Sequence, residues 1–218
     1  MYWAEGYPPP SAKFFNMPEF SKKEKILLKS MDTPAKVQDF LNSLPFNFEK
    51  EGETVKSPIR TMRERNAHCL EGALLGSYIL SLHGFPPLLL HLKTTRNDFD
   101  HVIAPFQIRG RWGALSKTNH SVLRYREPVY KSVRELVMTY FHEYFTDDGK
   151  KNLRKYSLPL NMKVFEPGWE TEEEDLWGVD DELDKIKHYD VAPKSALKNM
   201  RLADEIVRKA GEKQEYKM

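Results

Sequence analysis

The sequence predicts an α+β domain, and three observations support this fold class. Residues 67–82 form an apolar run with a length typical of a buried helix, and the charge of Glu71 within it argues against a membrane span. Residues 101–117 have the pattern of two strands joined by a tight turn at Arg109-Gly110. Amphipathic helical patterns flank this centre on both sides. We therefore expect a buried helix packed on an antiparallel sheet, with helical additions at both ends.

Composition excludes several classes of protein. With 40% hydrophobic and 12% aromatic residues in 218, the chain can bury a substantial core. Its 34 Lys and Arg nearly balance its 32 Asp and Glu, which disfavours a dedicated nucleic-acid-binding protein. A single cysteine excludes an intramolecular disulfide framework and a multi-cysteine zinc site.

The sequence carries no recognisable targeting or membrane signal. The first residues lack a basic region followed by an apolar run, so we expect no secretory signal and no membrane partner. A lone thiol suits a reducing compartment. We therefore expect a cytoplasmic protein.

The N-terminal segment predicts short elements. Residues 1–20 are rich in proline and aromatic side chains and indicate an irregular arm. Residues 21–45 predict one or two short amphipathic helices, the second capped by Thr33 with Pro34 at its first position. Residues 46–60 predict a polar connector.

The central segment predicts the buried helix and the first strand. Asn66 is a suitable N-cap for a helix over residues 67–82, and His83-Gly84 is a suitable end. The stretch "FPPLLLHLKT" over residues 85–94 then predicts a strand entered through two prolines.

The second half predicts a long helix, a strand and a charged extension. Residues 127–145 carry a helical pattern with Pro128 near the first turn, and residues 152–165 indicate a strand and a loop. Composition becomes strongly acidic after residue 166, and residues 192–218 predict a basic-leaning helix. The expected organisation is an irregular arm (1–20), an α+β domain (21–165) and a charged C-terminal extension with a terminal helix (166–218).

The candidate chemistry centres on Cys69. With Asn66 as cap, Cys69 falls in the first helical turn, where unpaired N–H groups and the helix dipole favour a thiolate. His101 opens a strand further along and could act as base or as imidazolium partner. A third polar group must orient the imidazole, and Ser116 and Asn119 follow the next strand.

Two stretches resemble the transglutaminase-like superfamily. The sequence "AHCLEGALLGSYILSLHGFPPLLLHL" is similar to its cysteine helix, and "DHVIAPFQIRGRWGALSK" is similar to its histidine hairpin. The resemblance covers roughly residues 60–120 and extends to a group of bacterial proteins without assigned function. It implies a papain-like, transglutaminase-like α+β core in which a cysteine helix packs on an antiparallel sheet.

The resemblance also implies a mechanism. Cys69 would attack an amide carbonyl to form a thioester, His101 would move the proton, and the Cys69 N–H could stabilise the oxyanion. The superfamily usually has aspartate where this chain has Ser116, and we favour Asn119 as the group that orients His101. The expected activity is that of a cysteine peptidase or amidase acting on a peptide or amide. The alternative is a non-catalytic module that binds a peptide or a protein partner.

Four further residues are candidates for substrate contacts or for supporting the catalytic pair. His68 neighbours the cysteine, but successive helical residues point about 100° apart, so we expect a packing or supporting role. Glu71 is expected to be a buried, hydrogen-bonded carboxylate. Asp100 is expected to tune His101 or to cap a turn, and Trp112 to pack in the hairpin.

Metal, cofactor and nucleic-acid sites are disfavoured. His91, Asp98, Asp100 and His101 offer donor atoms close in sequence, but they match no known metal-ligand spacing. No glycine-rich loop leads from a strand into a helix, so we expect no cofactor. The basic residues within 117–126 are expected to form a solvated face rather than a nucleic-acid site.

Overall fold

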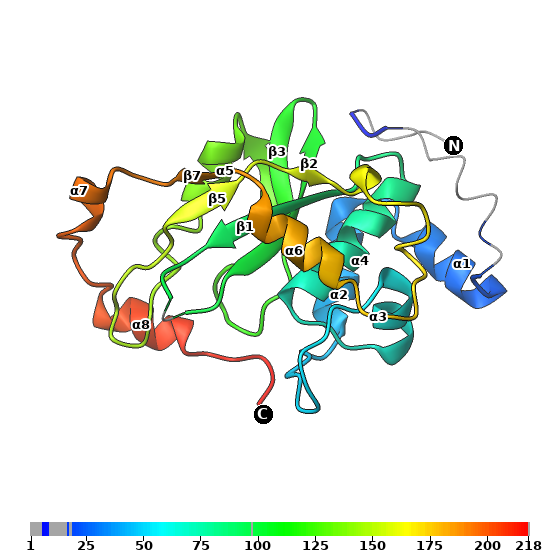
Figure 1. The fold of residues 1–218 in the computed structure, drawn as a ribbon, viewed down its shortest axis with the longest axis horizontal. Helices are drawn as coiled ribbons and strands as arrows, with labels where there is room; N and C mark the ends of the chain where they lie inside the picture. Colours follow the sequence, from blue (N-terminus) through cyan, green and yellow to red (C-terminus); the bar gives the residue numbers. More distant parts are fainter. Residues whose placement is uncertain (1–5, 9–16, 18, 97, 218) are drawn as a thin grey trace.

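The computed structural model describes residues 6–8, 17, 19–96 and 98–217, and it confirms the predicted α+β architecture. A seven-stranded antiparallel sheet runs through the molecule, and helices α1 to α4 gather at one end beside it (Figure 1). Most of the predicted N-terminal arm lies outside the described residues.

The elements follow one another from the N-terminal helices into the sheet. The helices are α1 (Lys22–Ser30), α2 (Pro34–Ser43), α3 (Pro58–Glu64), α4 (Cys69–Leu82), α5 (Val133–Met138), α6 (Trp177–Lys185), α7 (Lys194–Leu197), α8 (Glu205–Gly211) and the 3₁₀ turn η2 (Met162–Val164). The strands are β1 (Leu88–Lys93), β2 (His101–Ile108), β3 (Arg111–Leu115), β4 (Arg126–Tyr130), β5 (Lys155–Ser157), β6 (Leu160–Asn161) and β7 (His188–Asp190). None of the described helices combines the length and apolar character needed to cross a bilayer.

The sheet is built around the predicted strand and hairpin. Its order is β4-β3-β2-β1-β5-β7, with β6 also pairing with β1. Arg109 and Gly110 join β2 to β3 with φ of 50° and 72°, the left-handed pair of values that a two-residue type I′ hairpin requires. Gly84, with φ of 87°, ends α4 ahead of β1 as predicted.

Alternate residues of the central strands bury two cores. Leu89 and Val102 pack into the core shared with α1, α2 and α4. Leu90 and Ile103, one position further along each strand, pack into the second core with α5 and the segment that follows it. The sheet is therefore covered on both faces.

Helix α4 is present as predicted, but it begins later than expected. The predicted cap Asn66 is wrong, because His68 is the N-cap and accepts the Leu70 N–H at 3.3 Å. Glu71 completes a capping box by accepting the His68 N–H at 3.1 Å. Cys69 is consequently the first residue of the helix rather than the third, where it remains at the positive end of the helix dipole.

The long helix predicted over residues 127–145 is wrong. Pro128 and Val129 belong instead to β4, an edge strand that tolerates proline because one side of it needs no hydrogen bonds. Ser132 then caps the short helix α5, which ends at Met138 in a series of turns. Helical periodicity in this segment is overridden by pairing at the sheet edge.

The C-terminal extension packs on the domain through several short elements. Val179 and Leu183 of α6 are buried in the core that contains α4. The single helix predicted over residues 192–218 is divided into α7 and α8. Ala203, between them, donates its N–H to the carbonyl of Gly149 at 2.9 Å, a tertiary bond that replaces a helical one.

Candidate active site

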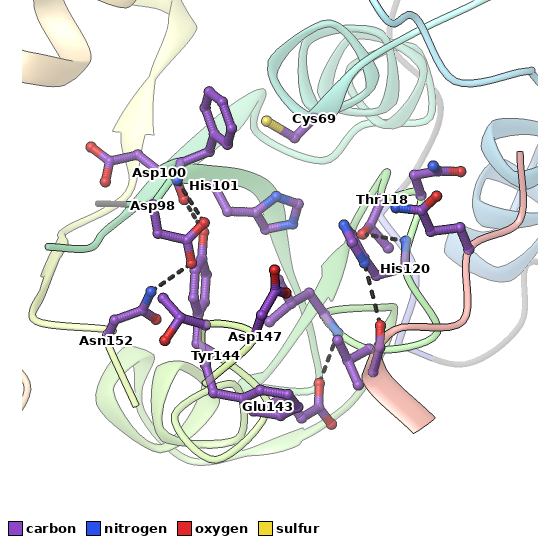
Figure 2. A pocket seen from close by; sticks show the side chains of 18 of the residues that line it. Cys69, Asp98, Asp100, His101, Thr118, His120, Glu143, Tyr144, Asp147 and Asn152 are labelled. Carbon is purple, nitrogen blue, oxygen red and sulfur yellow. Dashed lines mark hydrogen bonds between the residues drawn. The ribbon is translucent and has the colours of Figure 1, made fainter. Parts of the chain in front are cut away.

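A cavity of about 1180 Å³ opens where α4 meets the sheet. Cys69 and His101 lie at one end of it, on the first residue of α4 and the first residue of β2 (Figure 2). The remaining walls come from residues 46–49, from the turn before β2, from the loops around residues 117–123 and 143–154, and from residues 208–214. The topology thus brings together side chains that are far apart in the sequence.

The surroundings of Cys69 favour the ionised form of its thiol. Its side chain is half-buried and lines the cavity. Burial raises the pKa of the thiol, but interactions with His101 and His68 outweigh burial and hold the pKa well below its usual range. Its position at the helix N-terminus acts in the same direction.

The partner of His101 is Ser116. The His101 Nε2 lies 2.8 Å from the Ser116 Oγ, and both residues are buried. Ser116 has one hydroxyl proton, which it donates to the carbonyl of Leu123 at 2.5 Å. The Ser116 oxygen therefore accepts a hydrogen bond from the Nε2–H of His101, and this leaves Nδ1 as the ring nitrogen able to take a proton.

The Leu123 carbonyl is itself held in place. Leu123 has a φ of 60°, unusual for a residue other than glycine, and its N–H donates to Glu143 Oε2 at 2.8 Å. Arg126 pairs with the same carboxylate oxygen at 2.6 Å. A chain of contacts from Arg126 through Glu143 and Leu123 thus fixes the hydroxyl that orients the histidine ring.

Asn119, which the sequence favoured as the orienting group, makes other contacts. Its side-chain amide donates to the Tyr216 carbonyl and accepts the Tyr216 N–H, each at 2.9 Å. Asn119 lines the cavity, but it is Ser116 that contacts the His101 ring.

His68 lies against the thiol as well. The expectation that it points away assumed a helical residue, whereas His68 is the N-cap with extended backbone. A neutral ring donates from Nε2 to the Thr54 carbonyl at 2.8 Å and accepts the Leu70 N–H at Nδ1. Burial lowers the pKa of His68, but interactions with the Cys69 thiolate and Glu71 raise it to about 9.

Glu71 is fully buried beneath the start of α4. Its carboxylate accepts the Thr54 hydroxyl at 2.8 Å, the Lys56 N–H at 3.2 Å and the Asn47 amide at 3.1 Å. These contacts satisfy the charge and tie the preceding loop to the helix end.

Asp100 and Trp112 have different surroundings. Asp100 lines the cavity, accepts the Thr94 N–H at 2.7 Å, and pairs through its other oxygen with His91 Nε2 at 3.1 Å. It therefore caps the turn before β2. Trp112 packs against the second core of the sheet, opposite Tyr130 of β4.

One group of side chains near the cavity offers metal-ligand atoms. His91, Asp100 and Asp184 have donor atoms within 4.8 Å of one another. Lys93 already pairs with Asp184 at 2.6 Å, so two hydrogen-bonded pairs account for the arrangement.

The sequence did not indicate Tyr144, and the solvated face expected over residues 117–126 is wrong at Lys117, which is buried. The hydroxyl of Tyr144 donates to the Phe99 carbonyl at 2.5 Å, and its ring lines the cavity (Figure 2). Lys117 is buried, and burial lowers its pKa to about 8. Gly72 could have indicated the close approach of the Lys117 loop to α4. A Cβ at this position would lie 2.3 Å from the Lys117 Cβ, so only glycine leaves room for the loop.

Comparison with known proteins gives a partial match. No protein-family model matches the chain. Over 78 residues the chain is 33% identical to tubulinyl-Tyr carboxypeptidase 1 of Mus musculus. The match covers 33% of this chain and 20% of that protein, so the chain spans only a small part of the length of this relative. This similarity and the packing of α4 on an antiparallel sheet are both compatible with a papain-like core.

Proposed function

We propose that the chain is a thiol-dependent peptide or amide hydrolase that works through a thioester at Cys69. The observation that carries the proposal is the His101–Ser116 hydrogen bond beside a thiol of lowered pKa. Because the Ser116 proton is committed to Leu123, the free Nδ1 of His101 is the acceptor for the thiol proton.

The first half of the reaction forms the thioester. The Cys69 thiolate attacks the carbonyl carbon of the scissile amide, and the carbonyl oxygen takes the negative charge. The N–H of Cys69 would donate to this oxyanion, because at the first position of α4 it has no acceptor within the helix. The imidazolium of His101 then gives its Nδ1 proton to the leaving nitrogen as the C–N bond breaks.

The second half regenerates the enzyme. Water enters as the amine leaves, and His101 Nδ1 takes a proton from it while the oxygen attacks the thioester carbonyl. The C–S bond breaks, the acid is released, and the thiolate–imidazolium pair is restored. Throughout, Ser116 keeps the ring from rotating.

A neutral partner for His101 has a chemical consequence. An aspartate would stabilise the imidazolium by charge, whereas Ser116 stabilises it only by a hydrogen bond. The charge that balances the imidazolium is then that of the Cys69 thiolate, and His68 stabilises the same thiolate. Most of the activation of the thiol then comes from the two histidines and the helix N-terminus beside Cys69.

Peptides are the proposed substrates. The support is the partial similarity to a protein named as a carboxypeptidase and the size of the cavity around Cys69. In this proposal residues 21–165 form the transglutaminase-like catalytic domain, and a cytoplasmic location would keep the lone thiol reduced.

A second candidate function is a peptide-binding module without catalysis. Serine stands where the transglutaminase-like pattern has aspartate, and this substitution favours the candidate. The two functions differ in what happens to Cys69 when an activated acyl group reaches it.

Acyl transfer to Cys69 tests the proposal. The protein is incubated with p-nitrophenyl esters of N-acyl amino acids, and the mass of the Cys69 peptide is measured after rapid acid quenching. We expect one acyl group on Cys69, release of one nitrophenol in a burst, and loss of both in Cys69→Ala. Absence of the adduct in the wild-type protein across a panel of esters would favour the binding module.

A further inference from the structure

Residues 213–216 lie beside the cavity as an added strand. They run antiparallel to residues 119–121, with His120 bridged to Gln214. Glu215 donates its N–H to the Asn119 carbonyl at 2.8 Å, and Ser121 donates its N–H to the Lys213 carbonyl at 3.0 Å. The contact thus has the hydrogen bonds of a sheet edge.

The Asn119 side chain extends this recognition to the next residue. Its amide makes one accepting and one donating bond with the backbone of Tyr216, each at 2.9 Å. Both bonds go to main-chain groups that every residue other than proline possesses. Asn119 is therefore suited to hold an extended peptide backbone regardless of its side chains.

Side-chain contacts add to the backbone bonds. Glu215 pairs with Arg124 at 3.0 Å, and the Tyr216 ring lies 5.4 Å from the Lys117 ammonium. The Arg124–Glu215 pair is about one-third exposed and contributes little by itself, whereas the Lys117 side chain is buried. The backbone bonds are the part of the site that any extended peptide can share.

The docked segment lies at the cavity that contains the thiol. Asn119 and His120 line that cavity, and so does Gln214 from the docked segment. Figure 2 shows Thr118 and His120 on the side of the cavity where the C-terminal ribbon passes, across from Cys69. An extended peptide held on residues 119–121 would therefore lie along the wall of the cavity that contains the thiol.

We propose that residues 119–121, with the Asn119 amide, form a binding edge for the backbone of an extended peptide, and that residues 213–216 occupy this edge as an internal competitor. The inference rests on the proposed function, because it names the subsite that a peptide substrate uses. A tethered segment acts at an effective concentration of the order of mM, so it excludes free peptides present at lower concentration. Peptide affinity is then reduced by the fraction of chains in which the edge is open.

Two variants at one position separate backbone from side chain. Glu215→Pro and Glu215→Ala both remove the carboxylate that pairs with Arg124, but only proline removes the N–H that donates to the Asn119 carbonyl. Both are made in the full chain carrying Cys69→Ser, so that binding is measured without acyl transfer. The probe is a fluorescein-labelled peptide GEKQEYK, the sequence of residues 211–217, followed by anisotropy.

We expect the Glu215→Pro variant to bind this peptide about tenfold more tightly than the Glu215→Ala variant. A peptide N-methylated at the positions of Glu215 and Tyr216 should lose binding at least tenfold, a control that leaves the protein unchanged. Adding Asn119→Ala to the Glu215→Pro variant should likewise weaken binding of the unmodified peptide at least tenfold. Equal affinity of the two Glu215 variants, undiminished binding of the methylated peptide, or no saturable binding by the proline variant would overturn the inference.

The outcome is separable from that of the proposed function. Peptide binding that depends on Asn119, together with a Cys69 that accepts no acyl group, would support the binding edge and contradict the proposed hydrolase activity. Acylation of Cys69 without peptide binding at Asn119 would support the proposed hydrolase activity and contradict the binding edge.

Discussion

His101 and His91 lie on neighbouring strands, and each hydrogen-bonds a polar side chain, yet only one of them lies beside the thiol. The Nε2 of His101 meets the neutral hydroxyl of Ser116 at 2.8 Å. The Nε2 of His91 meets the Asp100 carboxylate at 3.1 Å, the kind of partner that histidine bases commonly have. The other nitrogen of His91 faces the Leu183 carbonyl at 3.2 Å rather than a nucleophile.

Strand alternation explains why the charged partner is attached to the second histidine. Val102 points into the core shared with α4 and Ile103 into the second core, so His101 projects on the same side as Ile103. The side chain of Asp100, one residue before His101, lies on the opposite face of the sheet and contacts His91 there. A carboxylate–imidazole pair is therefore a poor marker of catalysis here, and nearness to the thiol is the better one.

The largest expected effect comes from removing the ring of His101. His101→Ala should lower the rate of Cys69 acylation by the p-nitrophenyl esters about 10²- to 10⁴-fold, because the thiol loses its base and its charge partner. His91→Ala is the matched variant on the neighbouring strand and should change the rate less than about threefold. Similar losses in the two variants would break the distinction between the pairs.

Removing the hydroxyl partner should have the next largest effect. Ser116→Ala leaves the His101 ring free to rotate and removes a hydrogen bond to the imidazolium, worth about 1.5–3 kcal/mol. Acylation of Cys69 should therefore slow roughly 10- to 100-fold. Asn119→Ala, measured in parallel, should leave the acylation of Cys69 by a small ester within a few-fold of wild type, since Asn119 does not contact the ring.

A smaller effect on the acylation rate is expected from Glu143, which contacts Ser116 only through Leu123. Glu143→Gln keeps an acceptor for the Leu123 N–H but removes the charge that pairs with Arg126. The Leu123 carbonyl should be held less firmly, and the acylation rate should fall about two- to fivefold. Rates measured at several pH values should fall together, because the substitution changes positioning and not the protonation of the ring.

The His91–Asp100 pair should affect the stability of the fold and not the reactivity of Cys69. Contacts with His91 and Thr94 outweigh burial and lower the pKa of Asp100, so the ionised form stabilises the fold above its ordinary pKa near 3.9. That contribution is lost as pH falls through the lower, folded value. Asp100→Asn should therefore unfold more easily than wild type at pH 7, by about 1 kcal/mol, with the difference vanishing in acid. Urea titrations at both pH values measure this, and the rate of Cys69 acylation should stay unchanged.

Local patterns predict the frame of the site well. The apolar run that became α4, the strand after Gly84 and the hairpin at Arg109-Gly110 all follow from periodicity and turn chemistry. These elements are determined by residues close together in the sequence, and they place Cys69 and His101 at adjoining ends.

The rest depended on tertiary contacts. The choice between Ser116 and Asn119 is made by the Leu123 carbonyl and by residues 213–216, which no local pattern joins to the hairpin. The helix predicted over residues 127–145 failed for the same reason, because pairing with β3 outweighs helical periodicity.

The most direct test of the central claim is the rate of Cys69 alkylation by iodoacetamide as a function of pH, in the native protein and in His101→Ala. The account predicts a rate that stays high well below pH 8.5, the ordinary midpoint for a thiol, and that loses this acidic arm in the variant. A slow rate that rises only near pH 8.5 and is unaffected by the substitution would contradict it.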